Sequence, residues 1–401
     1  MNKTYKKLNL KKKMKKIKKS KYKNNSVTKK KYKIANILNR RLNRTIKQNI
    51  ITIGILSAPY LSNTDSFITS YIASSYVKWL ESAGALVVPL AYDLPKPILN
   101  GFLKQLNGIL LIGGGIDNKS THSTEQFIFF EETIRYILNF ITYENKIGNY
   151  YPIWATCMSF ELIGILSINN NHILKYQNNI NKYLIKDGFY GSDSLKWTNS
   201  PSKIKRLFTK KEINDMEKYY SVFYAHSLSF ASNSEIGREI KKVTNIVATG
   251  ISQKKKIKYI AMYEHKDLPI YGVQFHPEKP AFEYENDGYR VPKSQIAITL
   301  SSKLANFFLN ECKKNHNIWI GGKKFYDFTI NDYNIFNKSI TSRIKYLHKS
   351  NISTFQIGDA GVYFFGSKII PSYSDILSNP WKAVKDNTYN SNKKIIEEDN
   401  P

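Results

Sequence analysis

Cysteine, long apolar runs and metal-ligand spacings are scarce in this sequence, and each scarcity excludes a class of protein. Only two of the 401 residues are cysteines, Cys157 and Cys312, too few for the disulfide framework of a small secreted domain. No run of about 18 apolar residues occurs, so we expect no membrane span. No histidines or cysteines fall at zinc-ligand spacing, so the sequence gives no support to a metal site.

Acidic residues are missing from the first 50 positions. These positions hold 20 Lys and Arg, whereas the remaining 351 residues hold 41 basic and 31 acidic residues. The net charge of +30 therefore describes mainly a basic arm over residues 1–49, whose Lys- and Asn-rich composition predicts disorder. A targeting role, or contact of this arm with nucleic acid or an anionic surface, is the alternative. No apolar segment long enough for a secretory signal follows Met1 or Met14, so no signal peptide is expected.

From residue 50 onward, short β-branched runs alternate with amphipathic segments. The runs predict buried strands, and apolar residues at three- and four-residue steps predict helices. In the first half, the expected strands are 51–56, 86–90, 108–112 and 152–155, and the expected helices are 68–83, 98–106 and 125–140. Such alternation predicts an α/β fold with a mostly parallel central sheet and helices on both faces.

The second half begins with a less regular stretch. Residues 168–218 are rich in Asn and Lys, and in this variable excursion we expect one strand at 172–176 and one helix at 204–216. Strands are expected again at 221–225, 246–251, 259–264, 270–275 and 362–365. Cys312 continues a helical series of apolar residues, which predicts a buried core thiol. We expect one catalytic domain over 50–366 and a loose tail over 367–401.

Cys157 stands where the fourth expected strand meets a helix. Small residues surround it in Ala155-Thr156-Cys157-Met158-Ser159, the pattern of a nucleophile elbow. A side chain there lies at a helix N-terminus, whose dipole and free N–H groups favour a thiolate. The alternative is an ordinary buried cysteine at a strand–helix junction.

A histidine and a carboxylate follow another expected strand, in Gly272-Val273-Gln274-Phe275-His276-Pro277-Glu278. Residues i and i+2 share one side of an extended segment, so Glu278 can reach and orient the His276 ring. A cysteine nucleophile needs such a base, and the base needs a third group. The alternative for His276 is a surface histidine with satisfied hydrogen bonds.

Three glycines, Gly113-Gly114-Gly115, end the third expected strand. Glycine lets backbone N–H groups point at a ligand, as an oxyanion hole requires. No Gly-Lys-Ser/Thr follows, so the segment is not a phosphate-binding loop. Taken alone, it could also be a plain loop.

A glycine loop, a cysteine elbow and a His-x-Glu segment in this order resemble the class I glutamine amidotransferase-like fold, a flavodoxin-like three-layer sandwich. Within that fold the chain resembles the γ-glutamyl hydrolase (folate γ-glutamyl hydrolase) family. The segments that carry the resemblance are 70–85, 107–115, 272–279, 351–356 and 363–365. It covers roughly residues 50–366, except the divergent stretch 168–218. The elbow departs from the family pattern, with Ala155 and Ser159 where glycines are usual, and Ser159 could strain the turn.

The resemblance implies a role for each site residue. Cys157 would be the nucleophile, His276 the base and Glu278 the group that orients it. Backbone N–H groups of Met158 and of Gly114 or Gly115 would form the oxyanion hole. The substrate-binding residues implied by the resemblance are Tyr71, Glu161 and His226.

The implied activity is cysteine-dependent hydrolysis of the γ-glutamyl bonds of folate polyglutamates through a thioester. No metal or organic cofactor is expected, and the partner is a small molecule, folyl-poly-γ-glutamate. A homodimer is left open. Family members are mostly lysosomal, vacuolar or secreted, but the missing signal peptide leaves a cytoplasmic location open. Two alternatives remain: a glutaminase that supplies ammonia to a synthase, and a non-catalytic homologue whose basic arm binds nucleic acid or an anionic surface.

Overall fold

The computed structural model describes residues 50–60, 70–114, 121–168, 184–286, 288–321, 326–333 and 361–365. The basic arm 1–49, the tail 367–401, Gly115 and the expected strand 172–176 lie outside the described residues.

The core of residues 50 onward is an eight-stranded sheet with the order β4-β1-β5-β6-β12-β11-β10-β8. The first five strands pair in parallel and the last three in antiparallel fashion. Every residue of the five parallel strands is buried, which explains why they read as continuous apolar runs. The bounds, in sheet order, are Leu86–Leu90, Thr52–Leu56, Gly108–Leu111, Ile153–Thr156, Ile270–Val273, Lys258–His265, Thr244–Ile251 and Lys196–Trp197.

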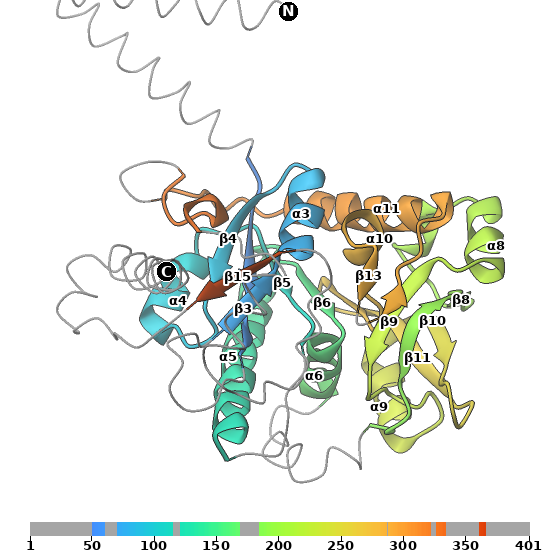
Figure 1. Ribbon diagram of the computed structural model, residues 1–401. Coiled ribbons are helices and arrows are strands. Elements are labelled where there is room, and N and C mark those ends of the chain that lie inside the picture. Colours follow the sequence, from blue (N-terminus) through green and yellow to red (C-terminus); the bar gives the residue numbers. More distant parts are fainter. Residues whose placement is uncertain are drawn as a thin grey trace, which may run out of the picture. The chain divides into compact units, whose positions relative to one another are not determined.

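Helices cover both faces of this sheet (Figure 1). Helices α5 (Thr121–Lys146), α6 (Met158–Ile168) and α9 (Glu235–Val243) lie on one face, and α3 (Ser74–Ser82), α10 (Lys279–Phe282) and α11 (Gln295–Cys312) lie on the other. Among the described residues, the other α-helices are α4 (Lys96–Leu103) and α8 (Lys210–Lys218). The predicted α/β class with a mostly parallel central sheet is confirmed. None of the helices within the described ranges has the length and apolar character needed to cross a bilayer.

A small sheet, β15-β3-β2, corrects the prediction of one helix over 68–83. Residues Ser70–Ala73 form β3, which pairs with β2 (Ala58–Pro59) on one side and β15 (Val362–Phe365) on the other, and α3 begins only at Ser74. Hydrogen bonds to other strands, above all to the distant β15, define β3, so a local helical period could not reveal this strand. Strand β15 has the predicted bounds.

The helix predicted at 204–216 is two elements. A 3₁₀ turn η1 (Lys205–Leu207) precedes α8, which starts at Thr209 with a capping box closed by Glu212. Strand β7 (Phe189–Asp193), which pairs with β9 (Val222–His226), was not predicted. The other short elements are β8 in the main sheet, the hairpin β13–β14 (Glu285–Asn286 and Tyr289–Arg290) and η2 (Ile330–Asp332).

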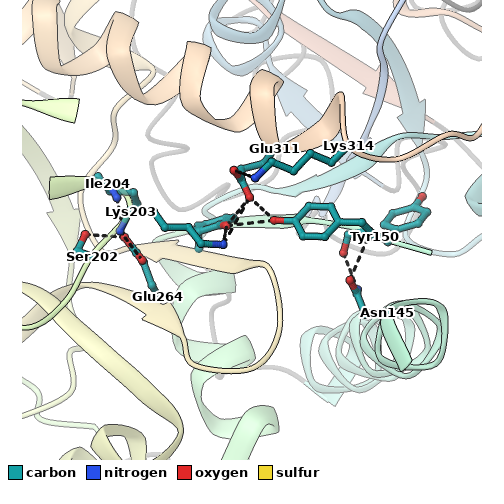
Figure 2. Close-up of polar contacts among 10 residues, drawn as sticks. Asn145, Tyr150, Ser202, Lys203, Ile204, Glu264, Glu311 and Lys314 are labelled. Atoms are coloured by element: carbon teal, nitrogen blue, oxygen red, sulfur yellow. Dashed lines mark hydrogen bonds and ion pairs between the residues drawn. The ribbon is translucent and has the colours of Figure 1, made fainter. Parts of the chain in front are cut away.

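A polar network fastens helix α11 to the edge of the sheet where β6 and β12 begin (Figure 2). The Glu311 carboxylate accepts hydrogen bonds from the Tyr150 hydroxyl, from the Tyr271 hydroxyl at 2.7 Å and from Lys314 Nζ at 2.5 Å. These donors hold the pKa of Glu311 below its usual value against the opposing effect of burial. Cys312, the next residue, is buried as predicted, and its Sγ packs over Gly108.

Candidate active site

The parallel strands bring the three predicted motifs to one edge of the sheet, the carboxyl edge. Strand β5 runs into Gly113, β6 ends one residue before Cys157, and β12 ends three residues before His276. Strands β5, β6 and β12 are neighbours in that order. Open α/β sheets place their sites at this edge.

Cys157 has the backbone of a nucleophile elbow. Its φ is 53°, in the left-handed region, and its N–H donates to the Val273 carbonyl at 2.8 Å. Such a conformation costs about 1–3 kcal/mol in a non-glycine residue. Ser159 is not strained: it lies in the first turn of α6, and its hydroxyl donates to the Ile112 carbonyl at 2.6 Å. The serine therefore fits the elbow.

The Cys157 thiol is in a less polar environment than its helix N-terminus suggested. Burial raises its pKa well above the usual value, and the Met158 N–H only partly offsets this effect. The charge of Glu161 adds to the shift only at a pH at which this carboxyl group is ionised. Gln274 Nε2 lies 3.9 Å from Sγ and the Ala225 carbonyl oxygen 3.7 Å. This shift favours a neutral thiol over the thiolate that the helix N-terminus suggested, and a neutral thiol needs a base when it attacks.

His276 and Glu278 form a close pair, with 2.7 Å between Nδ1 and Oε1. The pairing geometry differs from the extended segment that the sequence suggested, because Glu278 has helical dihedral angles (φ −73°, ψ −23°) at the start of α10. Donation of the Nδ1 proton to the carboxylate leaves a lone pair on Nε2. This Nε2 atom is buried and has no hydrogen-bond partner among the described residues. It can therefore accept a proton.

Gly113 marks how closely the base, the nucleophile and the loop pack. A Cβ at this position would lie 2.9 Å from His276 Cε1, 3.0 Å from Cys157 Cβ and 3.0 Å from the Tyr76 hydroxyl. Glycine is required here by this close approach. The Gly113 N–H already donates to Tyr76 Oη at 2.9 Å, whereas the described part of the chain offers the Gly114 N–H no partner. Of these two N–H groups, Gly114 is the one available to an oxyanion.

Glu161 and Gln274 form a second buried pair beside the thiol. Glu161 is in the first turn of α6 and accepts from Gln274 Nε2 at 3.0 Å. Burial raises the pKa of Glu161 to about 8, and the Gln274 hydrogen bond only partly offsets the shift. The carboxyl group is thus mostly protonated at neutral pH. Gln274 was not among the predicted site residues, and its position between β12 and His276 was the available signal.

His226 and Tyr71 approach the same edge from other strands. His226 ends β9, and its Nδ1 lies 2.8 Å from the Leu228 carbonyl, so Nδ1 carries the proton. Burial lowers the pKa of His226 to about 3, which keeps the ring neutral. The Tyr71 hydroxyl oxygen lies 3.1 Å from where a Cβ on Gly114 would stand. The structure thus gathers all predicted site residues that it describes; only Gly115 lies outside the described residues.

A family model described as Peptidase C26 matches residues 51–278, more than half of the chain. The chain belongs to the Peptidase C26 family. It is 30% identical to γ-glutamyl hydrolase B of Dictyostelium discoideum over 322 residues, which cover 79% of this chain and 88% of that protein. It is 33% identical to human γ-glutamyl hydrolase over 250 residues, 61% of this chain and 72% of the human protein.

A solved glutamine amidotransferase from Thermotoga maritima aligns with 65% of this chain and 98% of that chain, with a TM-score of 0.38 and 11% identity. Membership of the Peptidase C26 family confirms that the chain is an enzyme of the hydrolase class, and the relatives confirm the resemblance to γ-glutamyl hydrolases. The family match includes Cys157, His276 and Glu278. Within the described residues, no group of three or more His, Cys, Asp or Glu is placed to hold a metal ion.

Proposed function

We propose that this protein is a cysteine-dependent γ-glutamyl hydrolase that shortens the poly-γ-glutamate tail of folates. The observation that carries the proposal is the meeting of a strained Cys157, a buried His276–Glu278 pair and an unpartnered Gly114 N–H in the described part of the carboxyl edge. The similarity to proteins named γ-glutamyl hydrolases supports the γ-glutamyl bond as the bond that is cleaved.

The neutral thiol requires general-base catalysis from the start. Cys157 Sγ attacks the γ-carbonyl carbon while its proton passes to His276 Nε2, and Glu278 stabilises the imidazolium that forms. The oxyanion accepts hydrogen bonds from the N–H groups of Met158 and Gly114. Gly115, an alternative donor by resemblance, remains a prediction.

The tetrahedral intermediate then collapses. His276 returns the proton to the leaving amine nitrogen, the C–N bond breaks and a thioester on Cys157 remains. Water attacks the thioester carbon while His276 accepts a proton from it. The C–S bond breaks, the γ-carboxylate leaves, and the thiol regains its proton. No step needs an oxidant, a reductant or a metal ion.

Glu161, His226 and Tyr71 are proposed to bind the glutamate residue whose γ-bond is cut. A γ-glutamyl unit carries an α-carboxylate, which an ionised Glu161 would repel. The raised pKa of Glu161, about 8, keeps this group protonated at neutral pH and removes that repulsion. The neutral His226 ring offers its buried Nε2 as an acceptor for a substrate N–H group.

A substrate comparison tests the proposal. The purified protein is incubated with a folate carrying several γ-linked glutamates and, separately, with free glutamine. We expect shortened folates and released glutamate or γ-glutamyl peptide from the first substrate, with little ammonia from the second. Ammonia from glutamine without folate shortening would support the glutaminase alternative, and no turnover of either would support the non-catalytic one.

The domain limits and assembly state are part of the same proposal. We propose that the catalytic domain spans 50–366, and a homodimer is left open. Light scattering of the purified chain would test the dimer. Binding of the basic arm to nucleic acid remains the less favoured alternative to a disordered arm.

A further inference from the structure

Tyr76 lies between two parts of the proposed catalytic machinery that come from distant places in the sequence. It is a buried residue of helix α3. Its hydroxyl oxygen accepts from the Gly113 N–H at 2.9 Å and lies 3.2 Å from His276 Nδ1. One phenol oxygen therefore contacts both the glycine loop and the proposed base.

The hydrogen bonds at His276 Nδ1 show how the Tyr76 hydroxyl oxygen affects the imidazole ring. Nδ1 of His276 has one proton, which the Glu278 carboxylate accepts at 2.7 Å. Tyr76 Oη is a second, more distant acceptor beside the same proton and limits rotation of the ring. Burial raises the pKa of Tyr76 well above its usual value, so the group stays a neutral phenol.

The Gly113 contact decides which N–H of the loop is free. Because Tyr76 Oη occupies the Gly113 N–H, this donor cannot serve an oxyanion, and within the described residues the next one, on Gly114, is unpartnered. Glycines rotate at little steric cost, so the orientation of the Gly114 N–H depends on what holds its neighbour.

Helix α3 is itself fixed to the segment that carries the base. Trp79 Nε1 donates to the Ser301 carbonyl at 3.0 Å, and the Ser301 hydroxyl donates to the Pro277 carbonyl at 2.6 Å. Pro277 stands between His276 and Glu278. The Tyr76 hydroxyl therefore projects from a helix that is tied to the catalytic segment through α11.

We propose that Tyr76 is a positioning residue whose hydroxyl fixes the His276 ring and the Gly113–Gly114 peptide together, so that base and oxyanion donor face Cys157 at the same time. The proposal rests on the proposed function of this site. It assigns Tyr76 no contact with substrate.

The test is Tyr76→Phe, which removes a single oxygen atom. Tyr151→Phe is the matched control, because the Tyr151 hydroxyl is also buried and donates to the Leu103 carbonyl at 2.9 Å. Tyr151 precedes β6 at the opposite edge of the sheet. Each variant removes one buried hydrogen bond to a backbone group. The Leu103 carbonyl keeps a longer bond from Asn317 Nδ2 at 3.5 Å, so Tyr151→Phe should lower the melting temperature by the same amount as Tyr76→Phe or slightly less.

Two measurements separate positioning from stability. On a γ-glutamyl substrate, Tyr76→Phe should lower kcat by about tenfold or more with KM changed by less than about threefold, because the hydroxyl acts on the catalytic groups. Alkylation of Cys157 by iodoacetamide, followed by mass spectrometry, needs no substrate and should slow by about fivefold, since His276 would accept the thiol proton less well. Tyr151→Phe should leave both rates within about twofold of the wild type.

The proposal is overturned if Tyr76→Phe keeps kcat and the alkylation rate within about twofold of the wild type. Equal losses in the two variants would overturn it as well, because the effect would then be general destabilisation. A wild-type protein that turns over no γ-glutamyl substrate refutes the proposed function, and the alkylation comparison then decides on Tyr76 by itself.

Discussion

Two buried glutamates at opposite edges of the central sheet are in opposite electrostatic states. At the edge where β6 and β12 begin, Glu311 accepts from two tyrosines and a lysine, and its pKa is lowered. At the carboxyl edge, Glu161 accepts from Gln274 at 3.0 Å, and burial raises its pKa to about 8. Both side chains are nearly inaccessible to solvent, but Glu161 lies deeper in the protein, and the two differ in the number and charge of their donors.

This difference indicates that the edge with Glu311 stabilises the fold, whereas the edge with Glu161 carries the proposed reaction. The side chains of the Glu311 network satisfy one another's hydrogen bonds, and the network holds α11 against the sheet (Figure 2). The carboxyl edge instead keeps buried polar atoms that have no partner in the described part of the chain: Nε2 of His276, Nε2 of His226 and Oε1 of Gln274. A buried polar atom without a partner costs about 1–3 kcal/mol, so such atoms mark where a ligand can supply the missing hydrogen bonds.

Removal of the proposed base at the carboxyl edge should have the largest effect. His276→Ala should lower kcat by about 100- to 10,000-fold, the range of general acid–base assistance. Glu278→Gln should lower kcat less, because this side chain holds the ring and touches no substrate. Steady-state kinetics of both variants on one γ-glutamyl substrate checks the order. A rise in KM with unchanged kcat for Glu278→Gln would make Glu278 a substrate contact and leave Glu161 as the first candidate for the third group.

Ionisation of the two glutamates should change the stability of the folded state in opposite directions. Because the folded pKa of Glu161 is raised, its ionisation penalises the folded state as pH rises from the ordinary carboxyl value toward about 8. The lowered pKa of Glu311 stabilises the folded state above the ordinary value, and that stabilisation is lost as pH falls. Glu161→Gln should therefore raise the melting temperature most above pH 8. Glu311→Gln should destabilise by about 1–3 kcal/mol at neutral pH, with kcat unchanged.

The pH dependence of KM gives a second test of the protonation of Glu161. If a protonated Glu161 admits the substrate α-carboxylate, the wild-type KM should rise between pH 7 and pH 9, around its pKa of about 8. Glu161→Gln should flatten that rise, and Glu311→Gln should not. A wild-type KM that is constant over this range would show that Glu161 does not face the carboxylate.

The smallest effect is expected from the basic arm. Deletion of residues 1–48, which contain no acidic residue, should leave kcat/KM on a short polyglutamate unchanged, because the family match begins at residue 51. A loss of most of kcat/KM in the truncated protein would make the arm part of the site.

The regular part of the fold was predictable because its signals are local. Strand β4 and strand β15 have the predicted bounds, and the order of strand, glycine loop, elbow and His-x-Glu placed Cys157, His276 and Glu278 together. Strand β3 was missed because one of its partners, β15, is distant in the sequence and the other, β2, is only two residues long. Strand β7 likewise takes its hydrogen bonds from β9, about thirty residues further along the chain.

The site was predictable in its members and less so in its chemistry. A helix N-terminus suggested a thiolate, but burial raises the pKa of Cys157. Gln274 and Tyr76 act through contacts across the fold, with Glu161 and with Gly113, so no motif of their own marked them. Their roles depend on three-dimensional distances that composition and spacing do not contain.

The most direct test of the account is to trap the thioester. Wild-type enzyme mixed with a γ-glutamyl substrate, quenched in acid within the first turnover and digested, should show an acyl group on the peptide with Cys157 and none on the peptide with Cys312. Cys157→Ala should lose the adduct and the turnover, whereas Cys312→Ala should keep both, because Cys312 packs over Gly108 at the opposite edge. Normal turnover by Cys157→Ala would contradict the account.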